Sequence, residues 1–402
     1  MTRVWITGIG AITPLGNDLS TFADNLLAGH SGVAAHHLLR NDPNARQLAA
    51  VVGEIPAPRE WDLPAFGRLN RLEQLALSCT AGALHDADLW DRREDLRVGL
   101  VLGLGAEYLR VWELDVLAGG RRVYEPGNDS SSVVHLVHGQ LGLRGPALTV
   151  AAACASGGIA LAFGRRWIQS GLVDVCLVGG CDLVTPMAYA GFDNLRALSR
   201  YEGSPTAASR PFDRVRDGFV MGEGGAVFAL ESAGDACHRG ARVYAELAGC
   251  GMSSDGSHMV IPSADPRPAS RAMLRAMEDA SLGPDDLDYL NAHATSTPVG
   301  DRAEAAALQL ALGPAAARVP VSSTKSMTGH LLSGAAAVEA LACVVAIQYQ
   351  AVPPTINLDD PDPDCPLHHV RHQALSQPVR TAASNSFGFG GSNTCVILKK
   401  AA

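Results

Sequence analysis

The sequence predicts an α/β protein with a mostly parallel β-sheet, and two observations carry this prediction. Short apolar runs that end at glycines, as buried strands often do, alternate along the chain with longer runs whose apolar residues have helical spacing. Hydrophobic residues make up 47% of the 402 residues, which is enough material for a large core. Strands that alternate with helices are usually joined by crossover connections, which make neighbouring strands parallel.

The first half of the chain shows its elements in order. An apolar run into Gly8 predicts a strand at 4–7, and Asp18 or Ser20 is the expected N-cap of a helix at 20–27. Leucines at helical spacing then predict a helix at 71–86. The pattern continues with strands at 98–102, 147–152, 173–178 (closed by Gly179 and Gly180) and 226–231, and with helices at 130–141 and directly after Cys154.

The second half contains further apolar runs. One strand starts at Asp288 and leads to His293, and another is expected at 319–323. Small and apolar residues then predict a helix at 331–347. Near the C-terminus, two strands at 380–383 and 394–398 flank a glycine-rich turn.

The pattern restarts near Gly240, which suggests an internal duplication. Arg3-Val4 leads an apolar run into Gly8 and Gly10, and Arg242-Val243 leads a similar run into Gly249 and Gly251. A strand, Cys154 and a small-residue helix are echoed by the strand at 319–323, His330 and the helix that follows. We therefore expect two α/β halves, 1–240 and 241–402, packed as one body.

Composition restricts the compartment and the partners. The net charge of −9, without any basic run, argues against nucleic acid. Nine cysteines form no CxxC pair and include an odd one, which argues against a disulfide framework or a structural zinc site and fits a reduced cytoplasm. The start MTRVWITGIG has no secretory signal pattern. The longest uncharged run, 145–164, is expected in the core rather than in a membrane.

Cys154 lies at an expected strand-to-helix corner, among alanine, serine and glycine neighbours. A helix N-terminus favours negative charge, so we expect the pKa of this thiol to be lowered and the thiolate to act as a nucleophile. The alternative is an inert, buried cysteine, which is the usual role of a cysteine in an alanine-rich run.

Three later stretches add chemistry to this corner. They are NAHATSTPVGD with His293, SSTKSMTGHLL with Lys325 and His330, and the glycine turn SNSFGFGGSN with Phe389. Each histidine alone is explained by a hydrogen bond at the end of an element. Together with Cys154 they favour nucleophilic catalysis, in which imidazoles move protons and backbone N–H groups near Phe389 stabilise an oxyanion.

With these motifs, from VWITGIG to GFGGSN, the whole chain resembles the elongating β-ketoacyl-[acyl carrier protein] synthases of the thiolase superfamily. The resemblance implies a thiolase-like fold, with two pseudo-equivalent mixed-sheet halves in an αβαβα body. It also implies an acyltransferase that condenses malonyl-carrier, with loss of carbon dioxide, with an acyl group held as a thioester on Cys154. A fatty acyl or polyketide chain would be elongated without a metal or organic cofactor, because the carrier brings the phosphopantetheine arm.

The resemblance also assigns roles to other residues. His293 and His330 would promote decarboxylation beside Lys325, while Phe389 would contribute to the oxyanion hole and gate the two half-reactions. Further residues would contact the pantetheine arm (Thr295 and Thr297), line the acyl pocket (Leu104 and Phe192) and hold a structural monovalent cation, as in some relatives (Asn291, Ser384, Asn385 and Glu339).

An acyl carrier protein is the implied partner. The net charge of −9 does not prevent docking of an acidic carrier, because salt screens charges beyond about 8 Å and only the local patch matters. The arginines where relatives bind the carrier are Arg68, Arg71, Arg121, Arg122 and Arg196, for which ordinary surface positions are the alternative. The chain departs from the family pattern at Ala294, where most relatives have glycine, and in the segments 258–268 and 123–134.

Related activities remain as alternatives. A degradative thiolase would need a second cysteine where Phe389 stands, and a starter-type synthase would have asparagine in place of His330. A non-catalytic, chain-length-setting subunit would lack Cys154. The open alternatives are a homodimeric fatty-acid enzyme and the catalytic ketosynthase subunit of a specialised polyketide or polyene pathway, paired with such a partner. The polar segment 123–134 tilts the choice slightly towards the second.

Overall fold

The computed structural model describes residues 2–38, 46–105, 107–121 and 132–401. The strands are β1 (Val4–Ile12), β2 (Val33–His36), β3 (Gln47–Ala50), β4 (Val98–Gly103), β5 (Ala147–Val150), β6 (Val175–Asp182), β7 (Met221–Gly222), β8 (Gly224–Ser232), β9 (Ala245–Ser254), β10 (Tyr289–Asn291), β11 (Pro320–Ser322), β12 (Ala351–Val352), β13 (His368–His369), β14 (Leu375–Ser376), β15 (Thr381–Gly388) and β16 (Ser392–Lys399). The helices are α1 (Leu19–Leu27), α2 (Leu63–Phe66), α3 (Arg71–Asp86), α4 (Glu107–Leu117), α5 (Val133–Gln140), α6 (Ser156–Gln169), α7 (Pro186–Asn194), α8 (Ala233–His238), α9 (Arg267–Asp279), α10 (Pro298–Leu312), α11 (Lys325–Thr328) and α12 (Ala335–Tyr349).

Within the described residues, the large sheet has the strand order β13-β11-β10-β15-β16-β9-β1-β8-β6-β4-β5. The series β1-β8-β6-β4-β5 and β9-β16-β15-β10-β11 have the same pairing pattern, with two antiparallel pairs followed by two parallel pairs. The two series join where Trp5 pairs with Glu246 and Ile6 with Ala245. The expectation of a mostly parallel sheet is therefore wrong, because the long strands β8 and β16 run antiparallel to both of their neighbours.

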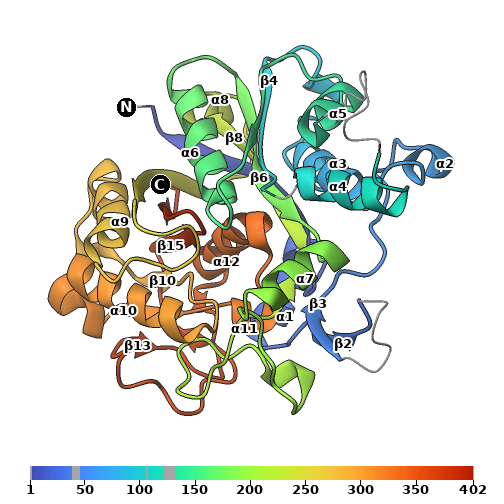
Figure 1. Cartoon of the computed structure of the whole chain (residues 1–402). Coiled ribbons are helices and arrows are strands. Elements are labelled where there is room, and N and C mark those ends of the chain that lie inside the picture. The colour runs from blue at the N-terminus through green and yellow to red at the C-terminus, as the bar shows by residue number, and fades with distance from the viewer. Residues whose placement is uncertain (1, 39–45, 106, 122–131, 402) are drawn as a thin grey trace.

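Helices lie between the two halves of the sheet and outside them (Figure 1). Residues of α6 and α12 share one core cluster with residues of β1, β6, β8 and β16. A second cluster packs α3 and α5 against the outer face of the first half, and a third packs α9 and α10 against the second half. The result is the layered αβαβα arrangement that the family resemblance implies.

Paired glycines bring an outer helix close to each half of the sheet. A Cβ atom on Gly10 would lie 2.0 Å from the carbonyl oxygen of Cys79 in α3, and one on Gly251 would lie 2.0 Å from that of Ala272 in α9. Real side chains never approach so closely. The repeated glycines of the sequence thus correspond to the same close approach in both halves, whereas the domain boundary near residue 240 stays a prediction.

The element bounds agree with the expected ones where local signals are strong. Helix α3 has the expected bounds, and the Asp18 side chain caps α1 by accepting the Thr21 N–H at 2.8 Å. The end predicted for the strand at 173–178 is wrong, since β6 continues through Gly179 and Gly180. These glycines allow β8 and the turn at Ser333 to approach the strand, because Cβ atoms there would lie 2.0 Å from the Ala226 oxygen and 2.6 Å from the Ser333 oxygen.

In the described part of the chain, one helical stretch is long and apolar enough to cross a membrane. It runs from Leu332 to Tyr349, and 89% of it is buried inside the protein. A helix surrounded by protein in this way is a core element, and α12 packs against strands of both halves. The run at 145–164 is not one continuous helix, because it includes β5 and the start of α6.

Candidate active site

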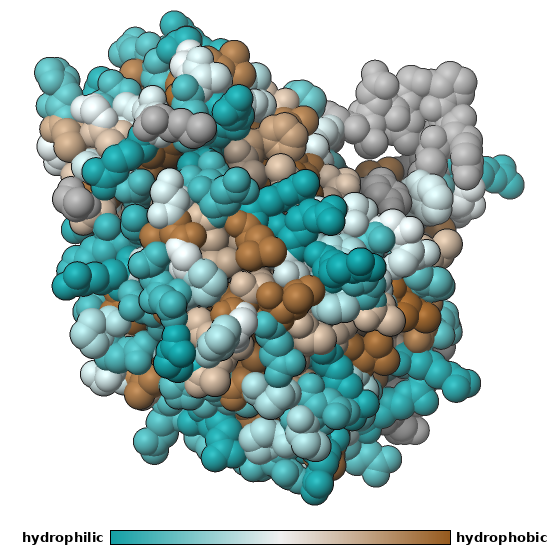
Figure 2. Space-filling model, turned by 90° about the vertical axis from the view of Figure 1, so that its left-hand side faces the viewer, coloured by the Kyte–Doolittle hydropathy of each residue, from teal (hydrophilic) through white to brown (hydrophobic). Residues whose placement is uncertain are grey.

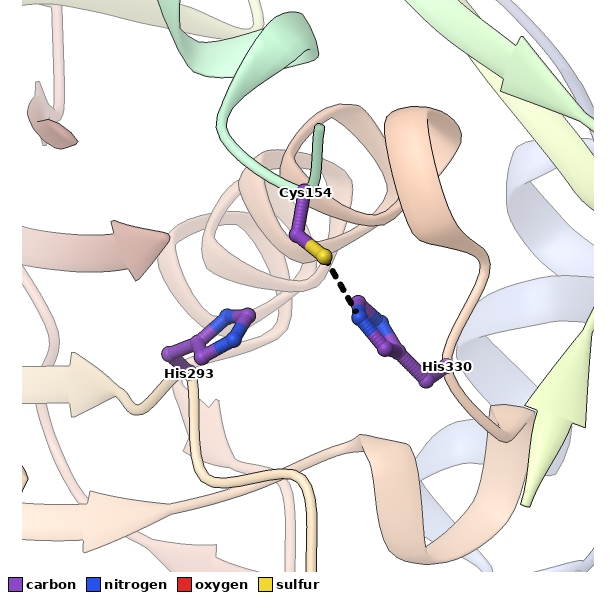
Figure 3. Close-up of side chains that lie close together, drawn as sticks. All are labelled: Cys154, His293 and His330. Atoms are coloured by element: carbon purple, nitrogen blue, oxygen red, sulfur yellow. Dashed lines mark hydrogen bonds between the residues drawn. The ribbon is translucent and has the colours of Figure 1, made fainter. Parts of the chain in front are cut away.

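Three side chains from different parts of the chain meet in one place. Cys154 lies between β5 and α6, His293 follows β10, and His330 follows α11. The Cys154 Sγ lies 2.9 Å from Nε2 of His330, and the two imidazole rings have centroids 5.4 Å apart and are nearly perpendicular. Figure 3 shows the sulfur pointing between the two rings. The structure therefore brings together the three residues on which the sequence prediction depends.

The backbone at the corner before α6 is sharply bent. Ala153 has φ 47°, a left-handed conformation that residues other than glycine rarely adopt. The Ser156 hydroxyl holds this bend, because it donates to the Ala153 oxygen at 2.6 Å and accepts the Ala152 N–H at 2.9 Å. The bend presents the Cys154 side chain to the histidines.

Burial, and not the helix terminus, controls the protonation of Cys154. The residue is 8% exposed, and loss of solvation raises the pKa of its thiol to about 12, although the nearby Lys325 charge acts in the opposite direction. A rise of three pKa units is worth about 4 kcal/mol, whereas a helix N-terminus contributes at most about 2 kcal/mol. The expectation of a lowered pKa is therefore wrong, and the resting residue is a neutral thiol hydrogen bonded to His330.

The two histidines are neutral as well. Burial lowers the pKa of both imidazoles well below 6.5, and the Lys325 charge lowers it further. Each ring keeps a buried Nδ1 atom that has no hydrogen-bond partner among the described residues. Neutral rings are the form in which imidazoles can accept a proton from a thiol or donate an N–H to a developing oxyanion.

Lys325 is buried and paired. Its ammonium group bonds the Glu339 carboxylate, which also accepts the Ser386 hydroxyl at 3.2 Å. Both members of the ion pair are less than 3% exposed as residues. The pair places a compensated positive charge near the histidines without exposing it to solvent.

Glu304 is a site residue that the sequence reasoning missed. Its carboxylate accepts the backbone N–H groups of His293 at 2.9 Å and Ala294 at 2.6 Å, and it also accepts the Asn385 amide. Burial raises the pKa of this carboxyl to about 7. The available signal was a pair of acids, Asp301 and Glu304, in an otherwise apolar helical stripe that continues to the buried Leu308.

The Asp182–Ser333 pair was also missed. Asp182 ends β6, and its carboxylate accepts both the backbone N–H and the hydroxyl of Ser333, while the Ser333 oxygen accepts the Gly105 N–H at 2.8 Å. These bonds join the end of β4 to the turn that follows His330. No sequence signal marks Ser333, because its partners come from distant segments.

The glycine-rich turn closes the site from the other side. The strands β15 and β16 extend further than expected, so the turn itself is confined to residues 389–391. The Phe389 N–H hydrogen bonds to the Cys154 sulfur. A Cβ atom on Gly388 would lie 2.6 Å from the Ala152 oxygen, so glycine is needed for this close approach.

A cavity of about 110 Å³ leads from the solvent to Cys154. Thr295 and Thr297 line it, and their hydroxyl oxygens lie 3.1 Å apart. Phe192 also lines it, with its ring 6.0 Å from that of Phe389. Leu104 is not among the lining residues, because its side chain is buried in the cluster beneath α3 and α5.

The segment 258–266, which departs from the family pattern, forms one wall of this cavity. The Met259 oxygen accepts the Gly390 N–H at 2.7 Å, so the wall is tied to the glycine-rich turn. Met259 and Ile261 are 76% and 55% exposed. Figure 2 shows the side that carries α9 and α10, where apolar residues gather near the middle of the face.

The four residues assigned to a cation do not all face one point. Asn291 and Ser384 are register partners on β10 and β15 and point to the side of the sheet on which Glu339 lies. Asn385 points to the opposite side, where it donates to Glu304. Within the described residues, Asn291 Oδ1 and Ser384 Oγ are buried without a hydrogen-bond partner. Two such oxygens near a carboxylate fit a cation, and Asn385 does not belong to the same group.

The five arginines considered for docking differ in their surroundings. Arg68, Arg121 and Arg196 are exposed, and Arg196 lies next to the cavity-lining Ala197. Arg71 is tied to the buried Glu223 at 2.6 Å and also donates to the Val52 oxygen, so its charge is already compensated. Arg122 and most of the segment 123–134 lie outside the described residues.

Comparison with known proteins agrees with this geometry. Residues 1–236 match the model of the Beta-ketoacyl synthase, N-terminal domain, and residues 244–359 match that of the C-terminal domain. The 3-oxoacyl-[acyl-carrier-protein] synthase 2 of Synechocystis sp. is 39% identical over 99% of this chain and 98% of its own length. The ishigamide ketosynthase/chain length factor has a TM-score of 0.90 and 31% identity, and a type II PKS ketosynthase in complex with its acyl-carrier protein has 0.89 and 31%, with both chains fully covered in each alignment.

Proposed function

The chain belongs to the β-ketoacyl synthase family, and from this premise we propose that it elongates an acyl chain held as a thioester on Cys154. It is a condensing acyltransferase, and the extending unit is a malonyl group on an acyl carrier protein. The observation that best supports the residue roles is the 2.9 Å contact between the Cys154 sulfur and His330, with His293 facing the same cavity.

In the first half-reaction, the Cys154 sulfur attacks the thioester carbon of an acyl-carrier. The thiol proton moves to Nε2 of His330 and then to the departing carrier thiol, which leaves the imidazole neutral again. The N–H of Phe389, which already points at the sulfur, and the N–H of Cys154 stabilise the oxyanion that forms on the substrate.

In the second half-reaction, the bond between the malonyl α-carbon and its carboxylate breaks and carbon dioxide leaves. The electron pair moves into an enolate, whose oxygen accepts N–H bonds from His293 and His330. The enolate carbon attacks the thioester on Cys154, the carbon–sulfur bond breaks, and the sulfur takes up one proton that comes from solvent. Both rings are neutral before the reaction, so they act as hydrogen-bond donors rather than as cations.

The remaining residues support this chemistry. Thr295 and Thr297 bind the pantetheine arm in the cavity, Phe389 gates access to the sulfur, Phe192 borders the acyl chain, and Lys325 tunes the histidines. Leu104 does not line this cavity, and its place in the acyl pocket rests on the family resemblance alone. The reaction needs no metal or organic cofactor of its own, since the carrier brings the phosphopantetheine. A monovalent cation at Asn291, Ser384 and Glu339 would support the strand ends below the site.

We further propose that the protein works with an acyl carrier protein in the cytoplasm, where nine free cysteines would stay reduced. It would function as a homodimer or with a homologous partner subunit. The similarity to a ketosynthase/chain length factor at TM-score 0.90 favours a polyketide or polyene pathway as the second candidate, beside fatty-acid synthesis.

The test uses the purified full chain with acyl-carriers of graded length and malonyl-carrier, with and without candidate partner subunits. Cys154→Ala should abolish the covalent acyl adduct in intact mass spectra, and His330→Ala should block carbon dioxide release although Cys154 remains. His372→Ala, at a 47% exposed side chain, is the control and should keep both activities. A covalent adduct on Cys154→Ala, or normal carbon dioxide release by His330→Ala, contradicts the assigned roles. Activity that requires the partner selects the specialised pathway.

A further inference from the structure

Cys154, His293 and His330 also have the geometry of a metal site. One potential ligand atom from each residue, the cysteine sulfur and a nitrogen of each ring, lies within 4.8 Å of the other two, and this is the one such group of three found in the described ranges. The three side chains come from separate loops and border a common space (Figure 3). The space opens into the cavity, so an ion can reach it from solvent.

The ligand set suits zinc. Zinc binds thiolate sulfur at about 2.3 Å and imidazole nitrogen at about 2.0–2.1 Å in tetrahedral geometry, so its ligand atoms are about 3.3–3.6 Å apart. The sulfur and Nε2 of His330 are 2.9 Å apart, and the widest separation in the group is below 4.8 Å. Side-chain rotations that shift each ligand atom by roughly an ångström would bring all three atoms within bonding distance of one ion, without movement of the strands and helices.

We propose that Cys154, His293 and His330 bind one Zn²⁺ ion and that this ion inhibits the protein. Binding replaces the S–H bond of Cys154 by a sulfur–zinc bond, and the proton leaves to solvent; no oxidant or reductant takes part. The fourth tetrahedral position faces the cavity and holds a water molecule or the thiol of a pantetheine arm. Inhibition of acyl transfer rests on the proposed function, whereas metal binding rests on the geometry alone.

The surroundings favour soft over hard cations. Mg²⁺ and Ca²⁺ need several oxygen ligands, and the carboxylates nearest the group already have partners. Glu304 accepts two backbone N–H groups and the Asn385 amide, and Glu339 bonds Lys325 and Ser386. The positive charge of Lys325 is compensated by Glu339, which limits its repulsion of an incoming ion. Zn²⁺ and Co²⁺ should therefore bind where Mg²⁺ does not.

The first experiment measures binding without any acyl substrate. The full chain, kept reduced by a phosphine, is titrated with Zn²⁺ by calorimetry and with Co²⁺ by absorption, since a tetrahedral cobalt–thiolate site gives a characteristic charge-transfer band. We expect one ion per chain, and no binding of Mg²⁺ at the same concentration. Cys154→Ala and His293→Ala should weaken Zn²⁺ binding at least about tenfold, and Cys154→Ala should abolish the cobalt band.

The matched control is Cys237→Ala, which removes an exposed cysteine on α8 far from the group in sequence and leaves the three ligands in place. It should bind both metals as the unaltered chain does. Circular dichroism and thermal melting establish that each variant is folded. Equal Zn²⁺ affinity in Cys154→Ala and the unaltered chain, or the absence of a saturable site in the unaltered chain, overturns the proposal.

The second experiment separates metal binding from the proposed function. Zn²⁺ should protect Cys154 from alkylation by iodoacetamide, as read by peptide mass, and a chelator should remove the protection. Acyl transfer from an acyl-carrier should be inhibited over the same Zn²⁺ range. Protection without any acyl transfer in metal-free protein would refute the synthase assignment and leave the zinc site standing. Acyl transfer that continues at saturating Zn²⁺, with Cys154 unprotected, would refute the zinc site and leave the synthase standing.

Discussion

The Cys154 thiol and the His330 ring share a 2.9 Å hydrogen bond in a pocket from which most water is excluded. Exclusion of water raises the pKa of the thiol and lowers that of the imidazole, so both partners are neutral at rest. A neutral pair avoids the cost of a buried ion pair that has few other hydrogen bonds. A charged group therefore forms only during the reaction, when the sulfur attacks the substrate carbonyl and negative charge develops on the carbonyl oxygen.

The pH dependence of stability should reveal the buried Asp182. Burial raises the pKa of its carboxyl from 3.8 to about 6, so the folded state holds a proton that the unfolded state has lost. Stability should fall as pH rises from about 4 to 6, by on the order of 3 kcal/mol, and then level off. Asp182→Asn should lack this component. The difference between the two melting temperatures, followed from pH 4 to 8, measures it, and a difference that is independent of pH contradicts it.

At the scale of single residues, the sequence predicted which residues form the site better than it predicted their protonation states. Cys154, His293 and His330 stand out because a nucleophile and two imidazoles occur at the ends of predicted elements. The sign of the Cys154 pKa shift was wrong because desolvation depends on neighbours from several distant segments. The contact between Asp182 and Ser333 was not predicted for the same reason, since the two residues are 151 positions apart in the sequence.

At the scale of elements, glycines set the distance between a helix and the sheet. Gly251→Ala should cost at least about 2 kcal/mol, because the new methyl group would overlap the Ala272 carbonyl of α9. Gly191→Ala is the control: it lies in α7 with nothing within 4 Å of its Cβ position, so it should be neutral or stabilising by about 0.5–1 kcal/mol. Urea unfolding of the two variants measures both effects. Equal free energies of unfolding would rule out this role for Gly251.

Element prediction succeeded where the signal is local. Leucine spacing predicted the bounds of α3, and Asp18, one of the two expected caps, caps α1. The glycines in β6 and the turn between β15 and β16 misled the prediction, because a glycine that ends a strand and one that admits a neighbouring backbone look the same in sequence. Only the packed partner, such as the Ala226 carbonyl, distinguishes them.

On the scale of the whole molecule, the two halves are locked together by a buried charge network. Arg216, from the first half, bonds Asp301 at 3.2 Å and Asp362 at 2.8 Å, and its guanidinium also donates to the Thr297 and Pro298 oxygens. These bonds fix the end of the loop that runs from His293 to the start of α10.

Removal of Arg216 should therefore be costly. Arg216→Ala leaves the buried Asp301 without its cation, while Asp362 keeps only the half-exposed Arg302, and should destabilise the fold by about 3–5 kcal/mol. Arg214→Ala removes a 62% exposed arginine paired with Asp360 and should cost at most about 1 kcal/mol. Thermal unfolding compares the two, and equal losses would show that the network carries little energy.

Carrier docking is tested on the surface beside the cavity. Arg196→Glu should weaken the use of acyl-carrier substrates, because it reverses a charge next to the cavity-lining Ala197. Acylation of Cys154 by a small, uncharged thioester should be unaffected. Arg166→Glu is the control, since Arg166 lies on the last turn of α6, at the end opposite Cys154. If both substrates lose the same activity in Arg196→Glu, the residue acts on the site and not on docking.

The layered architecture was anticipated because the family resemblance extends along the whole chain. The faint repeat of Gly8 and Gly10 by Gly249 and Gly251 corresponds to equal strand pairings in the two halves. The orientation of β8 and β16 was not anticipated, because alternation of strands and helices does not fix the direction of a strand that returns to the middle of a sheet. The sequence also could not show which arginines are free to bind a partner. Arg71, for example, is paired with Glu223 in the structure.

The central place of β1 has a consequence for synthesis on the ribosome. Its two neighbours are β8, which starts at Gly224, and β9, which starts at Ala245, so β1 has no partner in the large sheet until those residues have emerged. At about 5–20 residues per second, the nascent chain carries an unpaired apolar strand for roughly 10–45 s. Chaperone contact during translation should therefore concentrate on β1.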